Sequence, residues 1–329
     1  MEQRQFGATD LRTSAVGFGA WGIGGPAAVG GMPIGWGNVD DATSIRALKR
    51  ARDLGITFFD TADFYGFGHS EELLGRVFGN RGDIVVATKV GHRLSGNGSI
   101  ILDYSRDHIF RACDASLRRL GRETIDFYQL HSARLEHLEQ GECIEAMGQL
   151  RERGKVRFWG LSLNTFDPWP EAEYMISRKL GHGFQCVLNI INQRAVPLLS
   201  AAGAAGYGLI ARMPLQFGLL TGKFTVTTRF PSNDHRSFRL PASFLERAAG
   251  SLEKIQAVAE RLGISSTTLA LSFCAAFPDI STVIPGIKTP AQAEANSVLV
   301  ALPEAERDLL RSLYQDHLET LVAEMQKAG

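Results

Sequence analysis

The 329-residue chain has no excess of charge of either sign, because 35 Lys and Arg residues balance 35 Asp and Glu residues. No block of Lys or Arg provides the electrostatic footprint of a protein that binds nucleic acid or an acidic membrane. Long hydrophobic runs are also lacking, since the longest, residues 268–277, is far shorter than the roughly 20 residues of a membrane helix. We therefore expect neither nucleic acid nor membrane as a partner.

Cysteine is scarce as well. The chain has Cys113, Cys143, Cys186 and Cys274, widely separated and without a CxxC pair. Scattered cysteines in a chain of this length are typical of reduced core thiols. The first fourteen residues mix both charges and lack the apolar centre of a signal peptide. The expected location is cytoplasmic.

What the sequence has is glycine, 35 residues in all, and a repeated alternation of helix and strand. Amphipathic helices end at Gly55, Gly121 and Gly154, each directly before an apolar segment. Eight such segments are typical of buried strands, at residues 15–19, 57–62, 83–90, 125–131, 155–163, 184–190, 208–215 and 281–287.

Eight short apolar strands that alternate with helices indicate a parallel sheet buried on both faces. A doubly wound sheet and an α/β barrel both fit this pattern. The count of eight favours a single (β/α)8 TIM barrel, with active-site loops and extra helices at the carboxyl end. No linker divides the chain, so we expect one domain over residues 1–329. The polar, Pro-containing stretch 223–241 is expected to be a functional loop.

Two glycine-containing segments resemble phosphate-binding motifs. Residues 17–22 match GxGxxG, but the Gly- and Pro-rich stretch that follows cannot form the helix that a dinucleotide fingerprint must open. We interpret these glycines as shaping a loop at a strand end. Residues 218–223, GLLTGK, are one residue short of a P-loop, although their backbone N–H groups can still cradle a phosphate.

Four polar side chains lie at or just beyond the carboxyl ends of predicted strands: Asp60, Tyr65, Lys89 and His131. Taken singly, each has an ordinary structural explanation. Together they occupy the end of the barrel where such folds place their active sites. An ammonium lowers the pKa of a neighbouring phenol, a buried carboxylate keeps that ammonium charged, and a histidine can donate to a carbonyl oxygen. The set therefore predicts a proton donor directed at a carbonyl.

The sequence resembles the aldo-keto reductases over essentially its whole length. The resemblance is carried by GITFFDTADFYG (55–66), ATKV, IDFYQLH, GKVRFWGLS (154–162), FQCVLNIINQ, IARMPLQFGLLTGKF and VIPGIKTPAQAEAN. It implies a barrel that binds NADPH without a Rossmann domain and reduces an aldehyde or ketone. In that family pattern Tyr65 protonates the carbonyl oxygen, Lys89 and Asp60 tune Tyr65, and His131 orients the carbonyl.

The resemblance also implies a set of cofactor-binding residues, and it departs from the family pattern at one of them. The usual Asn after Ser162 is Leu163 here, and Asn164 comes one place late. Lys288 is the residue expected to select NADP over NAD. The full set is Gly19, Ala20, Trp21, Asp60, Ser162, Gln185, Arg212, Leu215, Gln216, Gly218, Leu219, Thr221, Lys223, Gly286, Lys288, Gln292 and Asn296.

Arg212 stands where many relatives stack a tyrosine on the nicotinamide. A guanidinium is also planar, but it carries a positive charge. Oxidised nicotinamide is cationic and the reduced ring is neutral. We hypothesise that Arg212 weakens the binding of NADP+ selectively and so biases the protein toward carbonyl reduction.

Other functions explain parts of the sequence. Lys89 alone suits a lyase-type barrel that forms a Schiff base, and some relatives are partner proteins, which leaves a cofactor-sensing regulatory subunit open. No metal is expected, since His131 and His137 have no third ligand at a suitable spacing. A small carbonyl substrate is expected to contact Trp21, Trp36, Phe64, Phe67, Arg134 and Phe217.

Overall fold

The computed structural model describes residues 1–35, 37, 39–232 and 234–327. Its main sheet has eight parallel strands, and each lies within or overlaps one of the eight predicted segments. Pairing between Val16 and Val283 and between Gly19 and Gly286 brings the first and last strands together, so the sheet is a barrel and not a doubly wound sheet. The strands are β3 (Phe18–Gly19), β6 (Phe58–Asp60), β7 (Val85–Val90), β10 (Ile125–His131), β11 (Val156–Ser162), β12 (Gly183–Val187), β13 (Gly208–Arg212) and β14 (Ile280–Ile284).

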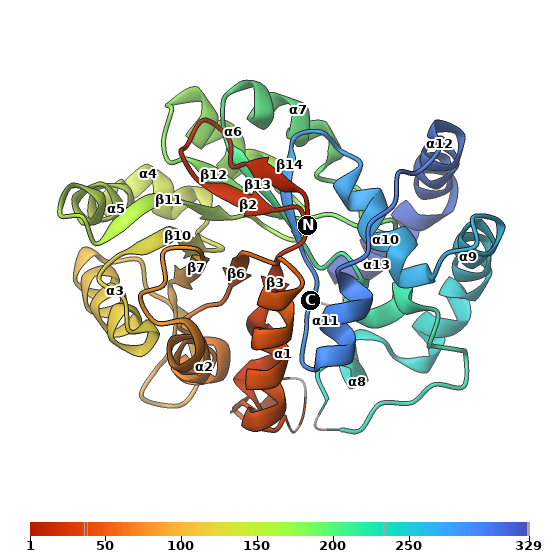
Figure 1. Cartoon of the computed structure of the whole chain (residues 1–329), viewed down its shortest axis with the longest axis horizontal. Coiled ribbons are helices and arrows are strands. Elements are labelled where there is room, and N and C mark those ends of the chain that lie inside the picture. Colours follow the sequence, from red (N-terminus) through yellow and green to blue (C-terminus); the bar gives the residue numbers. More distant parts are fainter. Residues whose placement is uncertain (36, 38, 233, 328–329) are drawn as a thin grey trace.

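Helices surround this barrel on the outside (Figure 1). At the start of α1 the Asp40 side chain accepts from the Thr43 N–H. Gly121, predicted as a helix end, ends α3 in a left-handed conformation. The helices are α1 (Asp41–Asp53), α2 (His69–Phe78), α3 (Arg106–Leu120), α4 (Leu135–Gln140), α5 (Glu142–Glu152), α6 (Trp169–Ser177), α7 (Val196–Ala204), α9 (Ala242–Arg261), α10 (Ser266–Ala275), α11 (Pro290–Asn296), α12 (Glu304–Leu313) and α13 (Glu319–Lys327).

An antiparallel hairpin that the sequence pattern did not predict covers the end of the barrel where the strands begin. It consists of β1 (Gln3–Gln5) and β2 (Arg12–Ser14). Thr13 donates to the backbone oxygen of Ser281 at 3.1 Å, near the start of β14. The connecting segment inserts the ring of Phe6 between barrel residues, 4.9 Å from the ring of Phe127.

Glycine makes room for the Phe6 ring. A Cβ atom at Gly183 or Gly208 would overlap this ring, so these two positions on neighbouring strands can carry no larger residue. The apolar layer that results contains Phe6, Leu11, Phe58, Ala87, Phe127, Ile210 and Ile284. Because strand side chains alternate, the residues two places further along β6, β7 and β10 form the next layer, and these are Asp60, Lys89 and Gln129.

Short turns and hairpins lie at the opposite end of the barrel. The glycine-rich stretch after β3 contains one short 3₁₀ turn, η1 (Ala20–Gly24), and the long segment 223–241 is a loop with one short helix, α8 (Arg236–Arg239). The remaining elements are β4 (Ala28–Val29), β5 (Met32–Pro33), η2 (Tyr65–Gly68), β8 (His92–Leu94), β9 (Ile100–Leu102), η3 (Gln216–Thr221) and η4 (Tyr314–Leu318).

Among the helices that the structure describes, none has the length and apolar character needed to cross a membrane. All four cysteines are buried and none is in a disulfide.

Candidate active site

The four predicted catalytic residues come together at the carboxyl end of the barrel. The Lys89 ammonium lies 2.6 Å from Oδ1 of Asp60 and 3.4 Å from the Tyr65 hydroxyl. The Tyr65 and His131 rings meet edge to face, with centroids 5.9 Å apart. These contacts join residues from β6, β7, β10 and the turn after β6, as the strand-end argument predicted.

Lys89 is fully buried and held from three sides, because it also donates to the backbone oxygen of Thr61 at 2.7 Å. Burial alone would lower the pKa of Lys89. The Asp60 carboxylate and the Tyr65 phenol outweigh that effect, so the pKa of Lys89 is raised and its ammonium stays charged.

Asp60 is anchored by two amides on its second oxygen. Gln185 donates to Oδ2 at 2.8 Å and Gln129 donates to the same atom at 3.1 Å. The family resemblance predicts that Gln185 binds the cofactor, whereas no sequence motif singles out Gln129. The strand period could have found Gln129, since it lies two residues before His131 and therefore on the same face of β10.

His131 is held as a neutral ring. Burial, followed by the nearby His92 and Lys89, lowers the pKa of His131 well below its usual value. The backbone oxygen of His131 accepts from the Tyr104 hydroxyl at 2.6 Å, which fixes the end of β10. Its Nδ1 is buried and has no hydrogen-bond partner among the described residues. A buried N–H without an acceptor is costly, so the geometry favours the proton on Nε2.

The turn that carries Tyr65 packs backbone to backbone against the turn that carries Trp21. Gly66 has a left-handed conformation, and a Cβ atom there would overlap the backbone of Gly24. This close contact places the ring centroids of Trp21 and Tyr65 6.3 Å apart. The glycines therefore set the position of the phenol relative to the barrel.

Three predicted cofactor residues, Gly19, Ser162 and Arg212, end strands β3, β11 and β13. Gln185 lies in the middle of β12, and Gly286 follows β14. The Asn164 side chain accepts from the backbone N–H groups of Phe166 and Asp167, so it caps the loop after β11. Leu163, in the position that usually carries Asn, is buried in the core. Neither residue thus replaces the usual asparagine.

The Arg212 side chain contacts the segment that follows Ser162. Its guanidinium donates to the backbone oxygen of Leu163 at 3.2 Å and to the Thr165 hydroxyl at 3.1 Å. Its Nε is buried without a partner, and it forms no ion pair among the described residues. Burial lowers the pKa of Arg212 from its usual high value. The site thus contains a cation that has no carboxylate within ion-pair distance among the described residues.

The residues expected at the two phosphate regions form two further groups. Around η3, Asn189 donates to the Gln216 side chain at 2.8 Å, and Thr221 donates to the backbone oxygen of Gly218 at 2.6 Å. Near α11, the backbone N–H of Lys288 donates to Gln292 at 2.7 Å.

Lys288 lies near two charged residues that no sequence motif predicts, Arg236 and Asp234. Burial and the nearby Arg236 lower the pKa of Lys288, while Asp234 opposes them. Arg236 is itself held by Asp234, with a separation of 2.6 Å. Two cations therefore lie close together beside α11. The Asn296 amide donates to the Gly286 backbone oxygen at 3.4 Å.

Aromatic rings predicted to contact the substrate lie near the four predicted catalytic residues. The ring centroids of Phe64 and Phe67 are 5.4 Å apart. The centroid of the His235 ring lies 5.2 Å from that of Trp21 and 5.6 Å from that of Phe217. The last two contacts bring the predicted functional loop 223–241 to this end of the barrel. Arg134 is exposed at the start of α4. Trp36, also predicted here, is outside the described residues.

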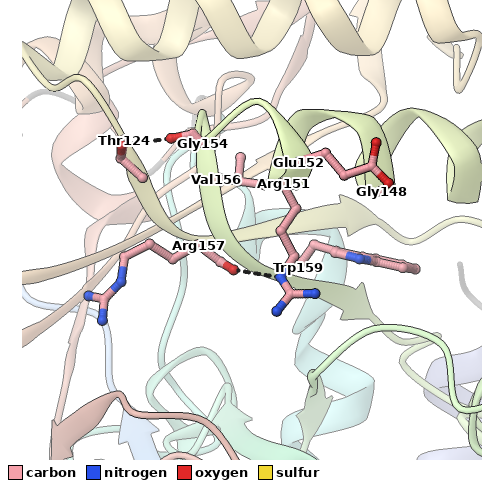
Figure 2. A pocket seen from close by; sticks show the side chains of 8 residues that line it. All are labelled: Thr124, Gly148, Arg151, Glu152, Gly154, Val156, Arg157 and Trp159. Carbon is pink, nitrogen blue, oxygen red and sulfur yellow. Dashed lines mark hydrogen bonds between the residues drawn. The ribbon is translucent and has the colours of Figure 1, made fainter.

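A cavity of about 630 Å³ lies elsewhere, at the beginning of β11. Figure 2 shows that the guanidinium groups of Arg151 and Arg157 point in different directions and do not converge on one point. Val156 starts β11, whereas Ser162 ends it beside His131, so this cavity is at the other end of the barrel from the catalytic group. No cluster of three metal-ligating side chains is present in the described part of the chain.

Comparison with known proteins agrees with this geometry. The model of the Aldo/keto reductase family matches residues 15–315, and the chain belongs to this family. L-galactose dehydrogenase of Arabidopsis thaliana is 30% identical over 91% of this chain and 88% of its own, and a probable voltage-gated potassium channel subunit beta of Oryza sativa subsp. japonica is 27% identical over 90% of each. Aldo-keto reductase AKR11C1 from Bacillus halodurans, in its holo form, superimposes with a TM-score of 0.78 at 26% identity, over 97% of this chain and 99% of that chain. The chain is thus an oxidoreductase-family barrel of the kind that uses a nicotinamide cofactor.

Proposed function

We propose that this protein is an NADPH-dependent reductase of aldehydes or ketones in which Tyr65 donates the proton. The observation that carries the proposal is the chain of contacts from Asp60 through Lys89 to the Tyr65 hydroxyl. A phenol at its ordinary pKa, near 10, is a weak acid at neutral pH. The charged Lys89 ammonium beside the hydroxyl can stabilise the negative charge that develops on this oxygen as the proton is transferred.

His131 would orient the substrate. As a neutral ring with its proton on Nε2, it can donate one hydrogen bond to a carbonyl oxygen that also accepts from Tyr65. Two donors that converge on this oxygen stabilise the negative charge that develops there during reduction. Asp60, held by Gln129 and Gln185, keeps Lys89 in place and acts on the substrate only through it.

The chain's own residues fit the cofactor. The Arg212 guanidinium has no ion-pair partner among the described residues, and its Nε is orphaned; it lies at the end of β13, where the resemblance expects the nicotinamide. Lys288 and Arg236 together suit a phosphate, and so support NADPH over NADH. When bound, NADPH would supply the hydride. We propose that the predicted cofactor-binding residues and the surrounding aromatic residues retain the roles given above, within one domain.

Two other functions are less well supported. A Schiff-base lyase needs a neutral lysine, but the pKa of Lys89 is raised and its ammonium has three partners. A regulatory role is suggested by the rice relative, whose name is that of a channel subunit. The intact set of Asp60, Tyr65, Lys89 and His131 favours turnover.

The test is to follow NADPH absorbance with sugars, short aldehydes, methylglyoxal, pyridoxal and aromatic ketones. Tyr65→Phe should lower kcat by about 10²- to 10⁴-fold and leave NADPH binding nearly unchanged. Tyr174→Phe is the matched control, since that hydroxyl bonds the backbone of Leu138 away from the catalytic group. Full activity in Tyr65→Phe would show that another group donates the proton.

A further inference from the structure

His92 has no role in the function proposed above, although it lies beside the catalytic group. It follows Gly91, where the chain turns sharply after β7 with φ of 131°. A Cβ atom at Gly91 would overlap the Tyr104 ring, so the turn is packed directly on that ring. The Tyr104 hydroxyl in turn holds the His131 backbone. One contact network therefore fixes both histidines relative to each other.

The hairpin of β8 and β9 supports His92 from the other side. His92 pairs with Leu102, and the Asp103 N–H donates to the Gly91 backbone oxygen at 2.8 Å. Arg93 and Asp103 form an ion pair of 2.8 Å across the same hairpin. The backbone of His92 is thus tied on both sides.

The His92 ring packs against the rings of His131 and Phe64. Its centroid lies 4.2 Å from that of His131, at an interplanar angle of 69°, and 5.6 Å from that of Phe64. The side chain is partly buried. Among the described residues its ring contacts are with His131 and Phe64, and no hydrogen bond to either ring nitrogen is found. Burial and the charge of Lys89 lower the pKa of His92 to about 4. At neutral pH the ring therefore offers one donor and one acceptor, and no described residue uses either of them.

We propose that His92 is a substrate-binding residue, which hydrogen-bonds a hydroxyl group on the carbon next to the reacting carbonyl. This proposal rests on the proposed function, because it takes the carbonyl oxygen to lie between Tyr65 and His131. Because the His92 ring packs on His131, we place the next carbon of the substrate beside it. A polar group with no partner in a partly buried site favours ligands that complete its hydrogen bond. The site therefore selects α-hydroxy carbonyl compounds over plain aldehydes and ketones.

The experiment compares substrates that differ only by a hydroxyl and a methyl group: glycolaldehyde with propanal, and hydroxyacetone with 2-butanone. For each, kcat/KM with NADPH is measured on the unhydrated carbonyl. The native protein should prefer the hydroxy compound about tenfold, which is the factor of one neutral hydrogen bond. His92→Phe should abolish this ratio and change kcat/KM for propanal less than about threefold. His92→Gln, which can still donate and accept, should retain part of the ratio.

His182→Phe is the matched control, because His182 is another partly buried histidine that packs on Trp159 and Phe158. It should leave the ratio as in the native protein. A ratio that persists in His92→Phe, or an equal loss for both members of a pair, would overturn the role of His92 while leaving carbonyl reduction intact. A native protein that reduces none of the four compounds, nor any of the wider panel, would overturn the proposed function itself. NADPH binding and the melting temperature show whether each variant is folded.

Discussion

The Gln185 amide donates to Oδ2 of Asp60 at 2.8 Å, so a residue expected at the cofactor also holds the carboxylate that pairs with Lys89. Gln129 donates to the same oxygen from the neighbouring side. The two glutamines therefore form a matched pair. One is expected to support both the cofactor and Asp60, and the other to support Asp60 alone.

Replacing these glutamines should separate the two tasks. Gln129→Met should lower kcat by about 3- to 10-fold, because Asp60 loses one neutral hydrogen bond, and leave the Kd for NADPH unchanged. Gln185→Met should lower kcat similarly and also raise the Kd about tenfold. Cofactor titration by fluorescence and steady-state kinetics measure both quantities. Equal NADPH affinities in the two variants would remove Gln185 from the cofactor site.

The unpaired charge of Arg212 should favour the reduced cofactor. Arg212→Tyr should bring the Kd values for NADPH and NADP+ closer together, because the cationic oxidised ring then meets no positive charge. Arg212→Lys keeps the charge and should keep the native ratio of the two Kd values. An unchanged ratio in Arg212→Tyr, measured by equilibrium titration with both cofactor forms, would reject the hypothesis.

Lys288 should determine the choice between NADPH and NADH. Lys288→Met should weaken NADPH binding by about 10- to 100-fold, the value of a charged hydrogen bond, and leave NADH binding unchanged. Lys223→Met tests a different phosphate region and should weaken both cofactors equally. Competition titrations give the four affinities. A similar loss for NADH in Lys288→Met would place this lysine away from the 2′-phosphate.

Stability should fall as the solution is acidified below pH 6.5. Burial, together with Arg239 and Arg236 and against Asp234, lowers the pKa of His235 to about 4, so the folded protein resists a proton that the unfolded chain accepts. Protonation between about pH 6.5 and 4 therefore favours unfolding. Asp63 acts in the opposite sense, because burial raises its pKa. The contribution of His235 is therefore measured by comparing the native protein with a variant that lacks this histidine.

His235→Phe isolates this effect, since the ring packs among Trp21, Phe217 and Phe238 and a phenyl ring fits that environment. Between pH 7 and pH 4.5, the free energy of unfolding from urea titrations should fall less in this variant than in the native protein. Equal slopes would mean that His235 titrates normally.

The sequence predicted the barrel because parallel strands buried on both faces leave near-continuous apolar segments, and all eight were recognisable. It predicted Asp60, Lys89 and His131 together because the carboxyl ends of such strands meet at one end of the barrel. The hairpin of β1 and β2 was not predictable in this way. Its three-residue strands carry no apolar alternation long enough to show a period.

Other features depend on contacts between distant segments. Asn164 could be found one place late in the sequence, but only the structure shows that it caps its own loop. His92 follows a glycine in a polar stretch without periodicity, and its proximity to His131 results from the packing of Gly91 on Tyr104. Arg236 is separated from Lys288 by some fifty residues and becomes its neighbour through the long loop alone.

The Phe6 ring affects the electrostatic environment of the Lys89–Asp60 ion pair. Phe6, Phe58 and Phe127 fill the barrel one layer below Asp60, Lys89 and Gln129. Polarisable water is thereby kept from the underside of the ion pair, and the attraction between two charges grows as the local dielectric constant falls. The first fourteen residues, remote in sequence from every reacting group, thus insulate the Lys89–Asp60 pair and help to set the strength of the field that acts on Tyr65.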